Sequence, residues 1–476
     1  MTEKSSLYQK PLAASLRHAT DFISGADTRS VAATADLATL RTRLGVTLGE
    51  DGVDAAVVID ELVRGVEGGI LGSAGPRFFG WVIGGALPAA LAADWLTSAW
   101  DQNAGMYSCA PAAAVVEEVA GEWLKDVLGL PAEASFALVT GCQMAHVTCL
   151  LAARRALLAR VWWDVEMEGM AGAPAIRILT STEIHATAVR ALRMLGMGQK
   201  NIVSLPADAD GRLREDALVA ALEGDRKAPT IVVLQAGDLN MGAFDDFRRL
   251  VPIAKRFGAW VHVDGAFGLW CGASPRFRHL MDGAAGADSW AADGHKWLNV
   301  PYDCGYAFVA DREAHHGSLS HKASYLTHAE EARDQIDWNP EWSRRARGFA
   351  TYAALRQLGR KGIAELIERT CECAGALVKR IGSLEGVEVV WEPRINQGMV
   401  RFIDPRAGAS EEDHDAFTDR MMEGILASGE AFFTGTTWRG RRAMRVSVCN
   451  WQTSAEDVDR VVTAVAGVLR AARGGK

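Results

Sequence analysis

Lys296 occupies an unusual place for a lysine, within the run SWAADGHKWLNVPYDCG at residues 289–305. Trp, Leu, Val and Cys surround it, Asp293 comes three residues earlier, and His295 is its immediate neighbour. Removal of an ammonium group from water disfavours its charged form, so burial lowers a lysine pKa and leaves more free amine. A free amine is a nucleophile toward carbonyl compounds. A single lysine in such a run is more often structural or exposed. Lys296 therefore indicates a catalytic role only if other functional residues accompany it.

Three further features place polar groups where strand patterns end. The segment TGCQMAHVTCLLAARR follows a strand pattern and opens a helix, so the N–H groups of Gly141, Cys142 and Gln143 would form an anion site. Asp264 ends the strand pattern in WVHVDGAFG, at the edge where open α/β sheets bind ligands. His185 follows another strand pattern in STEIHATAVRALRMLG. Each feature also has a plain structural interpretation, as a good turn, a helix cap or a satisfied histidine.

Together these features fit one cofactor, pyridoxal 5′-phosphate (PLP). The helix start would hold its phosphate, Lys296 would form an imine with its aldehyde, and His185 would stack on its ring. Asp264 would face the pyridine nitrogen and favour the protonated ring, which withdraws electrons more strongly. A nicotinamide-dependent dehydrogenase is not supported, because no GxGxxG motif follows an early strand with an acidic residue about 20 positions later.

The positions of these residues require a mostly parallel sheet in the middle of the chain. Between about 89 and 355, β-rich runs such as FALVTG and TIVVLQAG alternate with amphipathic helical stretches, as in a parallel sheet covered on both faces. Residues 1–88 contain helical patterns near 34–45 and 54–68 and then a Gly-rich stretch. We expect this segment to pack on another body, such as a second subunit. Residues 356–476 predict a small α+β domain, with a long helix before VEVVWEP, GMVRFID and MRVSVCN.

Composition narrows the class of protein. The 476 residues are 49% hydrophobic, which suffices for more than one core. The formal net charge is −8 and the sequence pI is near 5.8. This acidic balance disfavours a protein that binds nucleic acid or an anionic membrane surface. The eight cysteines form no CxxC pair, which favours reduced thiols over disulfides or a zinc site. No signal-peptide pattern or membrane-spanning stretch is evident, so we expect a cytoplasmic protein.

Four motifs, in unchanged order, resemble the group II PLP-dependent amino-acid decarboxylases: HVDGAFG, DSWAADGHKWLNVPYDCG, SYLTH and PEWSRRARGF. This family includes the aromatic L-amino-acid, histidine and glutamate decarboxylases, and the resemblance runs from about residue 78 to residue 451. The spacing of the acidic residue and HKW is specific, unlike a lone glycine motif. The resemblance implies the fold-type I architecture of aspartate aminotransferase, an α/β fold with a mostly parallel seven-stranded sheet flanked by helices. It also implies a homodimer with active sites at the subunit interface.

The resemblance implies roles for individual residues. Lys296 corresponds to the lysine that binds PLP covalently, and Asp264 to the partner of the pyridine nitrogen. Ala266 would pack under the ring, His185 would stack on it, and His295 would support the imine. The other cofactor contacts implied in this way are Gly141, Cys142, Gln143, Asn240 and Ser343.

Tyr325 resembles the tyrosine of the family's mobile loop, since YLTH matches the family pattern there. The surrounding HHGSLSHKASYLTHAEEARDQIDWNP is predicted to be a long polar loop, and a lid that closes over the substrate fits such a loop. Two features depart from the family. Asp238 and Met241 are unusual beside the cofactor, where Asp238 would be a turn residue or an added negative charge. Cys142 and Gln143 stand where Ser or Thr is frequent.

We predict α-decarboxylation of an L-amino acid, with Tyr325 as the proton donor to the α-carbon. Phe79 and Trp81, in GPRFFGWVIGG, are candidates for a substrate wall, which would favour an aromatic or hydrophobic substrate, or equally for a subunit interface. Arg77 is the basic residue of that stretch, so an acidic substrate is less favoured. Arg445, in RAMRVSVCN, would bind a carboxylate or pair structurally.

Three alternatives remain open at this point: a PLP-dependent aldehyde synthase, a carbon–carbon lyase, and a PLP-binding protein without catalysis. Tyr325 argues against the aldehyde synthase, because those relatives typically replace this tyrosine. The intact set of Lys296, Asp264, His185 and Tyr325 argues against the silent protein.

Overall fold

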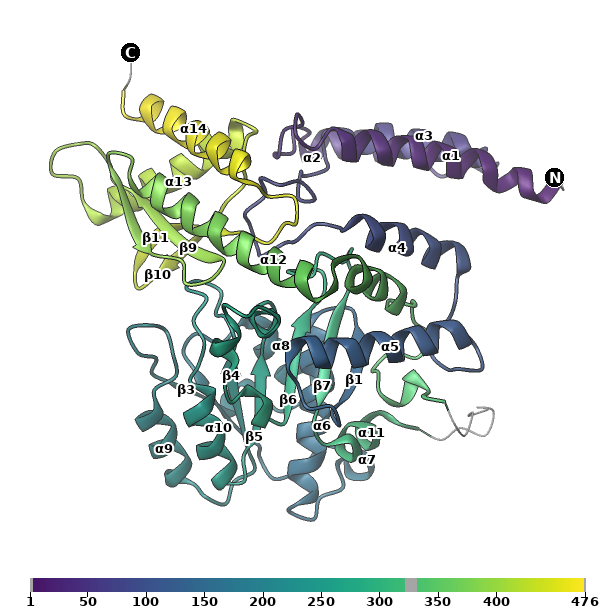
Figure 1. Cartoon of the computed structure of the whole chain (residues 1–476), viewed down its shortest axis with the longest axis vertical. Coiled ribbons are helices and arrows are strands. Elements are labelled where there is room, and N and C mark those ends of the chain that lie inside the picture. Colours follow the sequence, from purple (N-terminus) through teal and green to yellow (C-terminus); the bar gives the residue numbers. More distant parts are fainter. Residues whose placement is uncertain (1–2, 322–331, 475–476) are drawn as a thin grey trace.

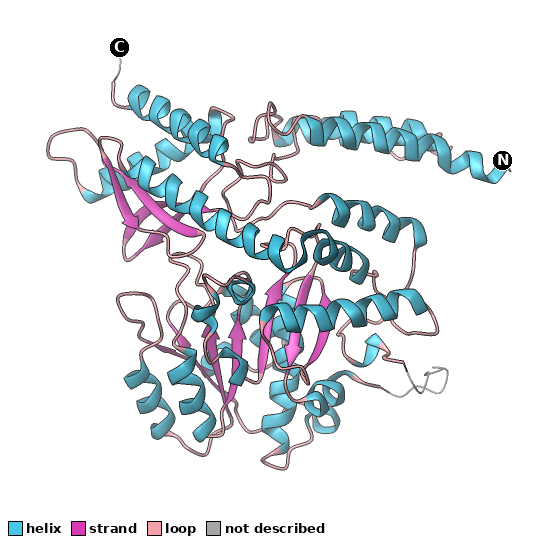
Figure 2. Cartoon of the chain, in the orientation of Figure 1, coloured by secondary structure: helices cyan, strands magenta, loops and turns pink. Residues whose placement is uncertain are grey.

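The computed structural model describes residues 3–321 and 332–474 and contains two β-sheets connected by helices (Figure 1, Figure 2). The strands of the large sheet are β1 (Ser135–Val139), β2 (Arg177–Ser181), β3 (Ile202–Leu205), β4 (Thr230–Gln235), β5 (Trp260–Asp264), β6 (Ser289–Asp293) and β7 (Gly305–Val309). Their order is β1-β7-β6-β5-β4-β2-β3. β7 is antiparallel to both neighbours, and the other pairs are parallel. The predicted mostly parallel seven-stranded sheet is confirmed.

Alternation along the strands divides their side chains between two buried faces. In β4, Val232 and Leu234 belong to one core cluster, and Ile231 and Val233 belong to the other. Helices cover both faces, as apolar parallel strands require. The first cluster includes residues of α5 (Pro111–Leu128), α9 (Glu215–Gly224) and α10 (Phe247–Arg256), and the second includes residues of α6 (Cys142–Ala159), α7 (Val165–Glu168), α8 (Ala186–Met194) and α11 (Arg312–Leu319).

A small antiparallel sheet follows in the C-terminal part of the chain. Its strands are β8 (Val387–Trp391), β9 (Gln397–Phe402), β10 (Thr434–Trp438) and β11 (Arg441–Ser447), in the order β10-β11-β9-β8. Helices α13 (Glu411–Ala427) and α14 (Ala455–Ala472) pack with it around a third core cluster. Strands β8, β9 and β11 correspond to the three predicted runs, whereas the polar TGTTW of β10 was not predicted.

Helix α12 (Gly348–Gly382) joins the two parts of the molecule. Ile363 and Ile367 lie in a core cluster of the large sheet, whereas Leu377 and Ile381 lie in the core of the small sheet. Gly359 interrupts the helical backbone with φ 59° and ψ −179°. The predicted division at residues 355/356 therefore falls inside α12. The division into 1–88, 89–355 and 356–476 stays a prediction.

Four helices precede the large sheet: α1 (Glu3–Ser24), α2 (Leu37–Leu44), α3 (Ala55–Val66) and α4 (Pro88–Trp100). α2 and α3 match the predicted patterns, and Figure 1 shows α1 and α3 side by side, extending away from both sheets. In the Gly-rich stretch, Phe78 stacks on Phe432 of the same chain at 4.4 Å between ring centroids. The packing of residues 1–88 on a second subunit stays a prediction. Within the described ranges, the helices fall short of the length and apolar character that a bilayer crossing requires.

The cysteines are single thiols in this fold. All eight lie among the described residues and none is paired; Cys109 is exposed and the other seven are buried. Burial raises the pKa of the Cys149 thiol to about 12 and that of Cys304 to about 11. These thiols therefore stay protonated at neutral pH and act as small core side chains.

Candidate active site

The segments that carry the predicted chemistry meet at one edge of the large sheet. The neighbouring parallel strands β5 and β6 end there, at Asp264 and Asp293. α6 starts at the same edge, because Gly141 follows β1 and touches Gly305 at the beginning of β7. A Cβ at position 305 would lie 2.5 Å from the Gly141 Cα, so glycine is needed where these two backbones meet.

Lys296 lies in the turn after β6, and its side chain is 18% exposed. Its Nζ is 3.2 Å from Asp293 Oδ2 and 5.9 Å from the centroid of the Phe267 ring. Burial acts to lower the Lys296 pKa, but the negative charges of Asp293 and Asp264 help to outweigh it, so the pKa is raised above its ordinary value. The expected lowering of this pKa was therefore wrong for the protein without a bound group. The amine is shielded from water, yet two carboxylates keep it protonated.

Asp293 connects the parts of the site, and the sequence analysis assigned it no role. Its Oδ1 accepts the Cys142 backbone N–H at 2.5 Å and lies 3.4 Å from His295 Nε2, while Oδ2 faces Lys296. Its backbone carbonyl accepts the Trp270 indole N–H at 3.0 Å. The signal that could have found it was its spacing, three residues before Lys296. Asp293 thus ties the start of α6 to the lysine.

Asp264 is 7% exposed and faces several groups that stabilise its negative charge. Its Oδ1 accepts the Ala266 N–H at 3.3 Å, and its Oδ2 is 3.5 Å from His146 Nε2. Burial acts to raise the Asp264 pKa, but His146, His185 and Lys296 together hold it well below the ordinary value for Asp. Asp264 therefore stays ionised and is suited to pair with a cationic ring nitrogen.

The two predicted histidines are each held by a backbone donor. His185 is the N-cap of α8, and its Nδ1 accepts the Thr187 N–H at 3.3 Å. His295 Nδ1 accepts the Cys304 N–H at 3.2 Å, and its ring stacks on Tyr302 at 4.3 Å between centroids. Burial lowers the pKa of both histidines. Both rings are therefore neutral near pH 7 and carry their proton on Nε2.

Comparison with known proteins identifies the family. A family model described as the pyridoxal-dependent decarboxylase conserved domain matches residues 40–403. The chain belongs to this family of decarboxylases. Its predicted PLP dependence and carboxy-lyase chemistry are confirmed at this level.

Relatives with known names differ in substrate. Tryptophan decarboxylase 1 from Oryza sativa subsp. japonica is 32% identical over 418 residues, which cover 82% of this chain and 80% of the relative. L-2,4-diaminobutyrate decarboxylase from Rhizobium meliloti (strain 1021) is 28% identical over 392 residues, 81% of this chain and 76% of the relative. The crystal structure of Oryza sativa TDC with PLP and tryptamine matches all of both chains with a TM-score of 0.91 at 25% identity. The predicted fold is confirmed by this likeness.

The residues of the decarboxylase fit PLP. Lys296 offers an amine for the aldehyde, Asp264 offers an ionised carboxylate for the ring nitrogen, and Gly141 leaves the first turn of α6 without a side-chain cap. One predicted phosphate donor has another partner here, because the Cys142 N–H is bound to Asp293. The Cys142 thiol faces Asp264 Oδ1 at 3.9 Å, so this side chain lies on the Asp264 side of the site.

Four other predicted cofactor or catalytic residues remain predictions. Gln143 is half-buried in the first turn of α6, and Asn240 Oδ1 accepts the Thr436 hydroxyl at 3.0 Å, which links the turn after β4 to β10. Ser343 is exposed ahead of α12. Tyr325 lies outside the described residues.

Phe79 does not line an open pocket, which corrects the prediction of a substrate wall at this residue. Its side chain is 0% exposed and packs on Phe433 at 5.2 Å between ring centroids, within the core of the small sheet. Trp81 is 52% exposed, and its ring contacts Phe432 at 4.8 Å between centroids. Trp81 therefore stays a candidate for contact with a substrate or a subunit.

Asp238 and Met241 have structural explanations. The Asp238 carboxylate accepts the N–H groups of Asn240, Met241 and Ala243 at 2.9, 3.1 and 2.6 Å, so it is the turn residue of the two alternatives. Met241 is 1% exposed and packs against Met399 of the small sheet. These two departures from the family pattern hold the turn after β4 against β9.

Arg445 is a buried cation near the site. It is 5% exposed, its Nη2 donates to Ser447 Oγ at 3.4 Å, and its Nε has no hydrogen-bond partner among the described residues. Burial lowers the Arg445 pKa to about 10, although Asp238 acts against this. A buried guanidinium with a free donor suits a carboxylate or a phosphate.

Two buried histidines predict a loss of stability in mild acid. Burial lowers the pKa of His262 and of His315 to about 3, against about 6.5 in an unfolded chain. Between these values the unfolded chain binds protons that the folded chain excludes. The free energy of unfolding therefore falls with falling pH, by ~1.4 kcal/mol per pH unit for each histidine. We expect the midpoint of thermal unfolding to drop between pH 6.5 and pH 4.

The check on this prediction is His315→Gln, which removes one of the two groups and should make the pH dependence shallower. His316→Gln is the matched control, since this neighbouring side chain is 47% exposed. Equal slopes in the wild type and His315→Gln would contradict the prediction.

Proposed function

We propose that this decarboxylase acts on an aromatic or other hydrophobic L-amino acid, as a cytoplasmic homodimer. The observation that carries the substrate class is that Arg77, Asp293 and Asp238 already have protein partners, whereas Arg445, whose Nε is free within the described part of the chain, is assigned no role in binding the substrate side chain. A charged substrate side chain would need a free partner of opposite charge in the pocket.

The guanidinium group of Arg77 is buried, and its nitrogens face protein acceptors rather than an acidic substrate. It is 1% exposed, its Nε donates to the Glu430 carbonyl at 2.9 Å, and its Nη2 donates to the Asp27 carbonyl at 3.1 Å. Its Nη1 lies 3.6 Å from Asp457 Oδ1. The basic residue of the candidate substrate stretch is therefore structural, which disfavours substrates with a carboxylate side chain.

The carboxylates of Asp293 and Asp238 also have protein partners already. This disfavours a cationic substrate such as a diamino acid. Asp293 binds the Cys142 N–H and Lys296, and Asp238 accepts three backbone N–H groups. Tyr302, by contrast, is 60% exposed beside His295. An aromatic wall of this kind, together with Trp81, suits a hydrophobic side chain. The likeness to tryptophan decarboxylase 1 points the same way.

In the proposed mechanism, PLP, when bound, supplies the electron sink for bond cleavage at the substrate α-carbon. Lys296 Nζ is the group that would hold the cofactor through its aldehyde, and Asp293 orients this amine. Asp264 would hold the proton of the ring nitrogen. A pocket that excludes water favours loss of the charged carboxylate as neutral CO₂. Tyr325 then donates its phenolic proton to the α-carbon, which completes the amine.

Tyr325→Phe is expected to change the product. Without the hydroxyl, proton delivery to the α-carbon fails, so amine formation should fall by roughly 10²- to 10⁴-fold while PLP binding is kept. With O₂ as the oxidant, the product becomes a carbonyl compound with ammonia and H₂O₂. Mass spectrometry of products and an oxygen electrode measure the shift. Tyr352→Phe, in α12, is the control, and a normal amine yield from Tyr325→Phe would remove this residue from the mechanism.

A panel of L-amino acids with purified enzyme and PLP tests the substrate class, aromatic ones first. CO₂ with amine supports the proposal, whereas carbonyl with H₂O₂ or glycine with aldehyde would show the aldehyde synthase or the lyase. Conversion of only diaminobutyrate or glutamate would overturn the substrate class. Absence of any turnover would favour the silent PLP-binding protein.

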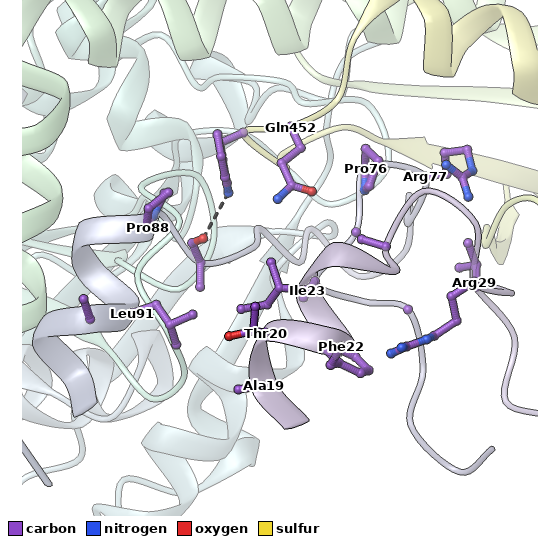
Figure 3. Close-up of a pocket in the computed structure, with 18 of the residues that line it drawn as sticks. Ala19, Thr20, Phe22, Ile23, Arg29, Pro76, Arg77, Pro88, Leu91 and Gln452 are labelled. Carbon is purple, nitrogen blue, oxygen red and sulfur yellow. Dashed lines mark hydrogen bonds between the residues drawn. The ribbon is translucent and has the colours of Figure 1, made fainter. Parts of the chain in front are cut away.

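The helical arm of α1 and α3 supports the homodimer. Leu7, Leu12 and Leu16 of α1 are 69%, 59% and 56% exposed, and Leu62 of α3 is 52% exposed. Exposed apolar faces of this kind mark interaction sites. A cavity of about 390 Å³ lies between α1, the Gly-rich stretch and α4 (Figure 3), and its lining includes none of the candidate catalytic or cofactor-binding residues. A second copy of the chain would cover these surfaces.

Sedimentation equilibrium measures this directly, with a dimer expected at twice the chain mass of 51.2 kDa. A concentration-independent monomer would refute the dimer. The eight free thiols support a reducing compartment such as the cytoplasm, which cell fractionation checks.

A further inference from the structure

A chain of buried polar side chains leads from Asp264 into the core. His146 Nε2 is 3.5 Å from both Asp264 Oδ2 and Cys142 Sγ, and the other ring nitrogen of His146 is 2.8 Å from His262 Nε2. His262 Nδ1 is in turn 2.9 Å from Ser289 Oγ. His146, His262 and Ser289 are each 0% exposed. Burial of three polar groups is costly unless they are hydrogen-bonded, and none of them has a task in the mechanism above.

The groups at the two ends of this series of side chains, Trp260 and Asp264, determine the direction of its hydrogen bonds. At one end the Trp260 indole, which is only a donor, donates to Ser289 Oγ at 2.9 Å. At the other end an ionised Asp264 is only an acceptor. With neutral rings, every bond is satisfied in one arrangement: Ser289 O–H donates to His262, His262 Nε2–H donates to His146, and His146 Nε2–H donates toward Asp264. The burial that lowers the His262 pKa to about 3 keeps that ring neutral.

In the described part of the structure, His146 is one of three protein groups that face the Asp264 carboxylate. This carboxylate also accepts the Ala266 N–H at 3.3 Å and faces the Cys142 thiol at 3.9 Å. Burial acts to raise the Asp264 pKa, and a hydrogen bond from His146 acts to lower it. A neutral carboxylic acid at this position would not attract a protonated ring nitrogen.

We propose that His146 is a positioning residue for Asp264: it donates a hydrogen bond that holds the carboxylate toward the cofactor's ring nitrogen, and His262 and Ser289 fix its tautomer. This inference rests on the proposed pairing of Asp264 with that nitrogen. It adds to the site a residue that touches neither substrate nor cofactor and acts through Asp264 alone.

The test compares two cofactors on full-length enzyme from which PLP has been removed. One is PLP, and the other is its carbocyclic analogue, in which a C–H replaces the ring nitrogen. His146→Leu should raise the Kd of PLP by about 10-fold and leave the Kd of the analogue unchanged, because the lost interaction acts only on the nitrogen. In His146→Gln the side-chain amide still donates, so the Kd of PLP should stay near that of the wild type. Protein fluorescence during titration measures both constants.

Ser289→Ala tests the same chain from its far end, where removal of a hydroxyl hardly changes the packed volume. We expect the same selectivity for PLP over the analogue, with a smaller effect of about 3-fold. His315→Leu is the matched control. This histidine is also 0% exposed and hydrogen-bonded at both nitrogens, to Ser135 Oγ and the Trp338 carbonyl. It should lower the unfolding temperature without a change in either Kd.

The outcomes separate this inference from the proposal on which it rests. Equal weakening of both cofactors by His146→Leu, or no weakening of either, would overturn the positioning role. Asp264→Ala should discriminate between the two cofactors in any case. If it does not, the pairing of Asp264 with the ring nitrogen fails, and the role of His146 fails with it.

A bound metal ion is a competing explanation for the same side chains. The ligand atoms of Cys142, His146 and Asp264 lie within 4.8 Å of one another, a set that zinc could use. Metal analysis of the purified holoenzyme should find no stoichiometric zinc. One equivalent of metal that His146→Leu removes would overturn the hydrogen-bond chain.

Discussion

Lys296→Ala should lower amine formation by at least about 10³-fold, because the variant loses both the covalent anchor of the cofactor and the amine that exchanges with substrate. The visible absorbance of the bound cofactor should disappear as well. The arrangement around Nζ explains the size of the effect. Asp293 Oδ2 lies 3.2 Å away, and no other lysine side chain is recorded in contact with Asp293 or Asp264 among the described residues.

Borohydride reduction followed by peptide mapping checks the assignment without mutation, since it should leave the label on Lys296. Lys227→Ala is the matched control, as this side chain is exposed on the loop after α9. A fully active Lys296→Ala, or a label elsewhere in active enzyme, would refute the assignment.

Asp264→Asn should lower kcat by roughly 10²- to 10³-fold with little change in packing. The amide keeps an oxygen that can accept from His146 and Ala266, so the substitution isolates the loss of negative charge. Without that charge the ring nitrogen is protonated less, and the electron sink weakens. Steady-state kinetics with PLP content measured in parallel separates this from cofactor loss.

Asp245→Asn is the control for burial of a carboxylate. Asp245 is 4% exposed and accepts the N–H groups of Leu213 and Gln235, and burial raises its pKa to about 6. This variant should keep its kcat while its stability changes. An Asp264→Asn enzyme with wild-type kcat would show that the ring nitrogen does not need the charge.

The core of the site was predictable because its residues follow strands. Asp264 ends the strand pattern WVHVDGAFG, and Lys296 follows at the spacing of the family motif, so both could be placed in one site. His146 could not be found in this way. It lies inside the helix pattern of α6, and its partner His262 comes 116 residues later on β5, so only the fold brings them together.

The errors at the site have a common physical cause. Phe79 was a candidate for a substrate wall, or equally for a subunit interface, because its stretch resembles the substrate wall of the family, but aromatic residues fill cores as readily as pockets. The Lys296 pKa was judged from burial alone, whereas Asp293 and Asp264 reverse the shift. Both errors concern which neighbours a side chain meets, and sequence patterns carry little information on that point.

The fold was predictable where periodicity was strong. The apolar runs in the sequence predicted strands β1, β4 and β5, and the helical patterns predicted α2 and α3. β3, β6 and β10 were missed, because IVSL, SWAAD and TGTTW are short and contain polar or small residues. α1 was also missed, and its residues Leu7, Leu12 and Leu16 are exposed in the single chain.

Helix α12 has a consequence for engineering by recombination. Its first part completes the hydrophobic interior under the large sheet and its last part that of the small one, so a gene junction within it would separate a segment that both cores share. Chimaeras that take the C-terminal part from another decarboxylase should therefore cross over before Gly348, and the donor's own version of the whole helix should travel with it.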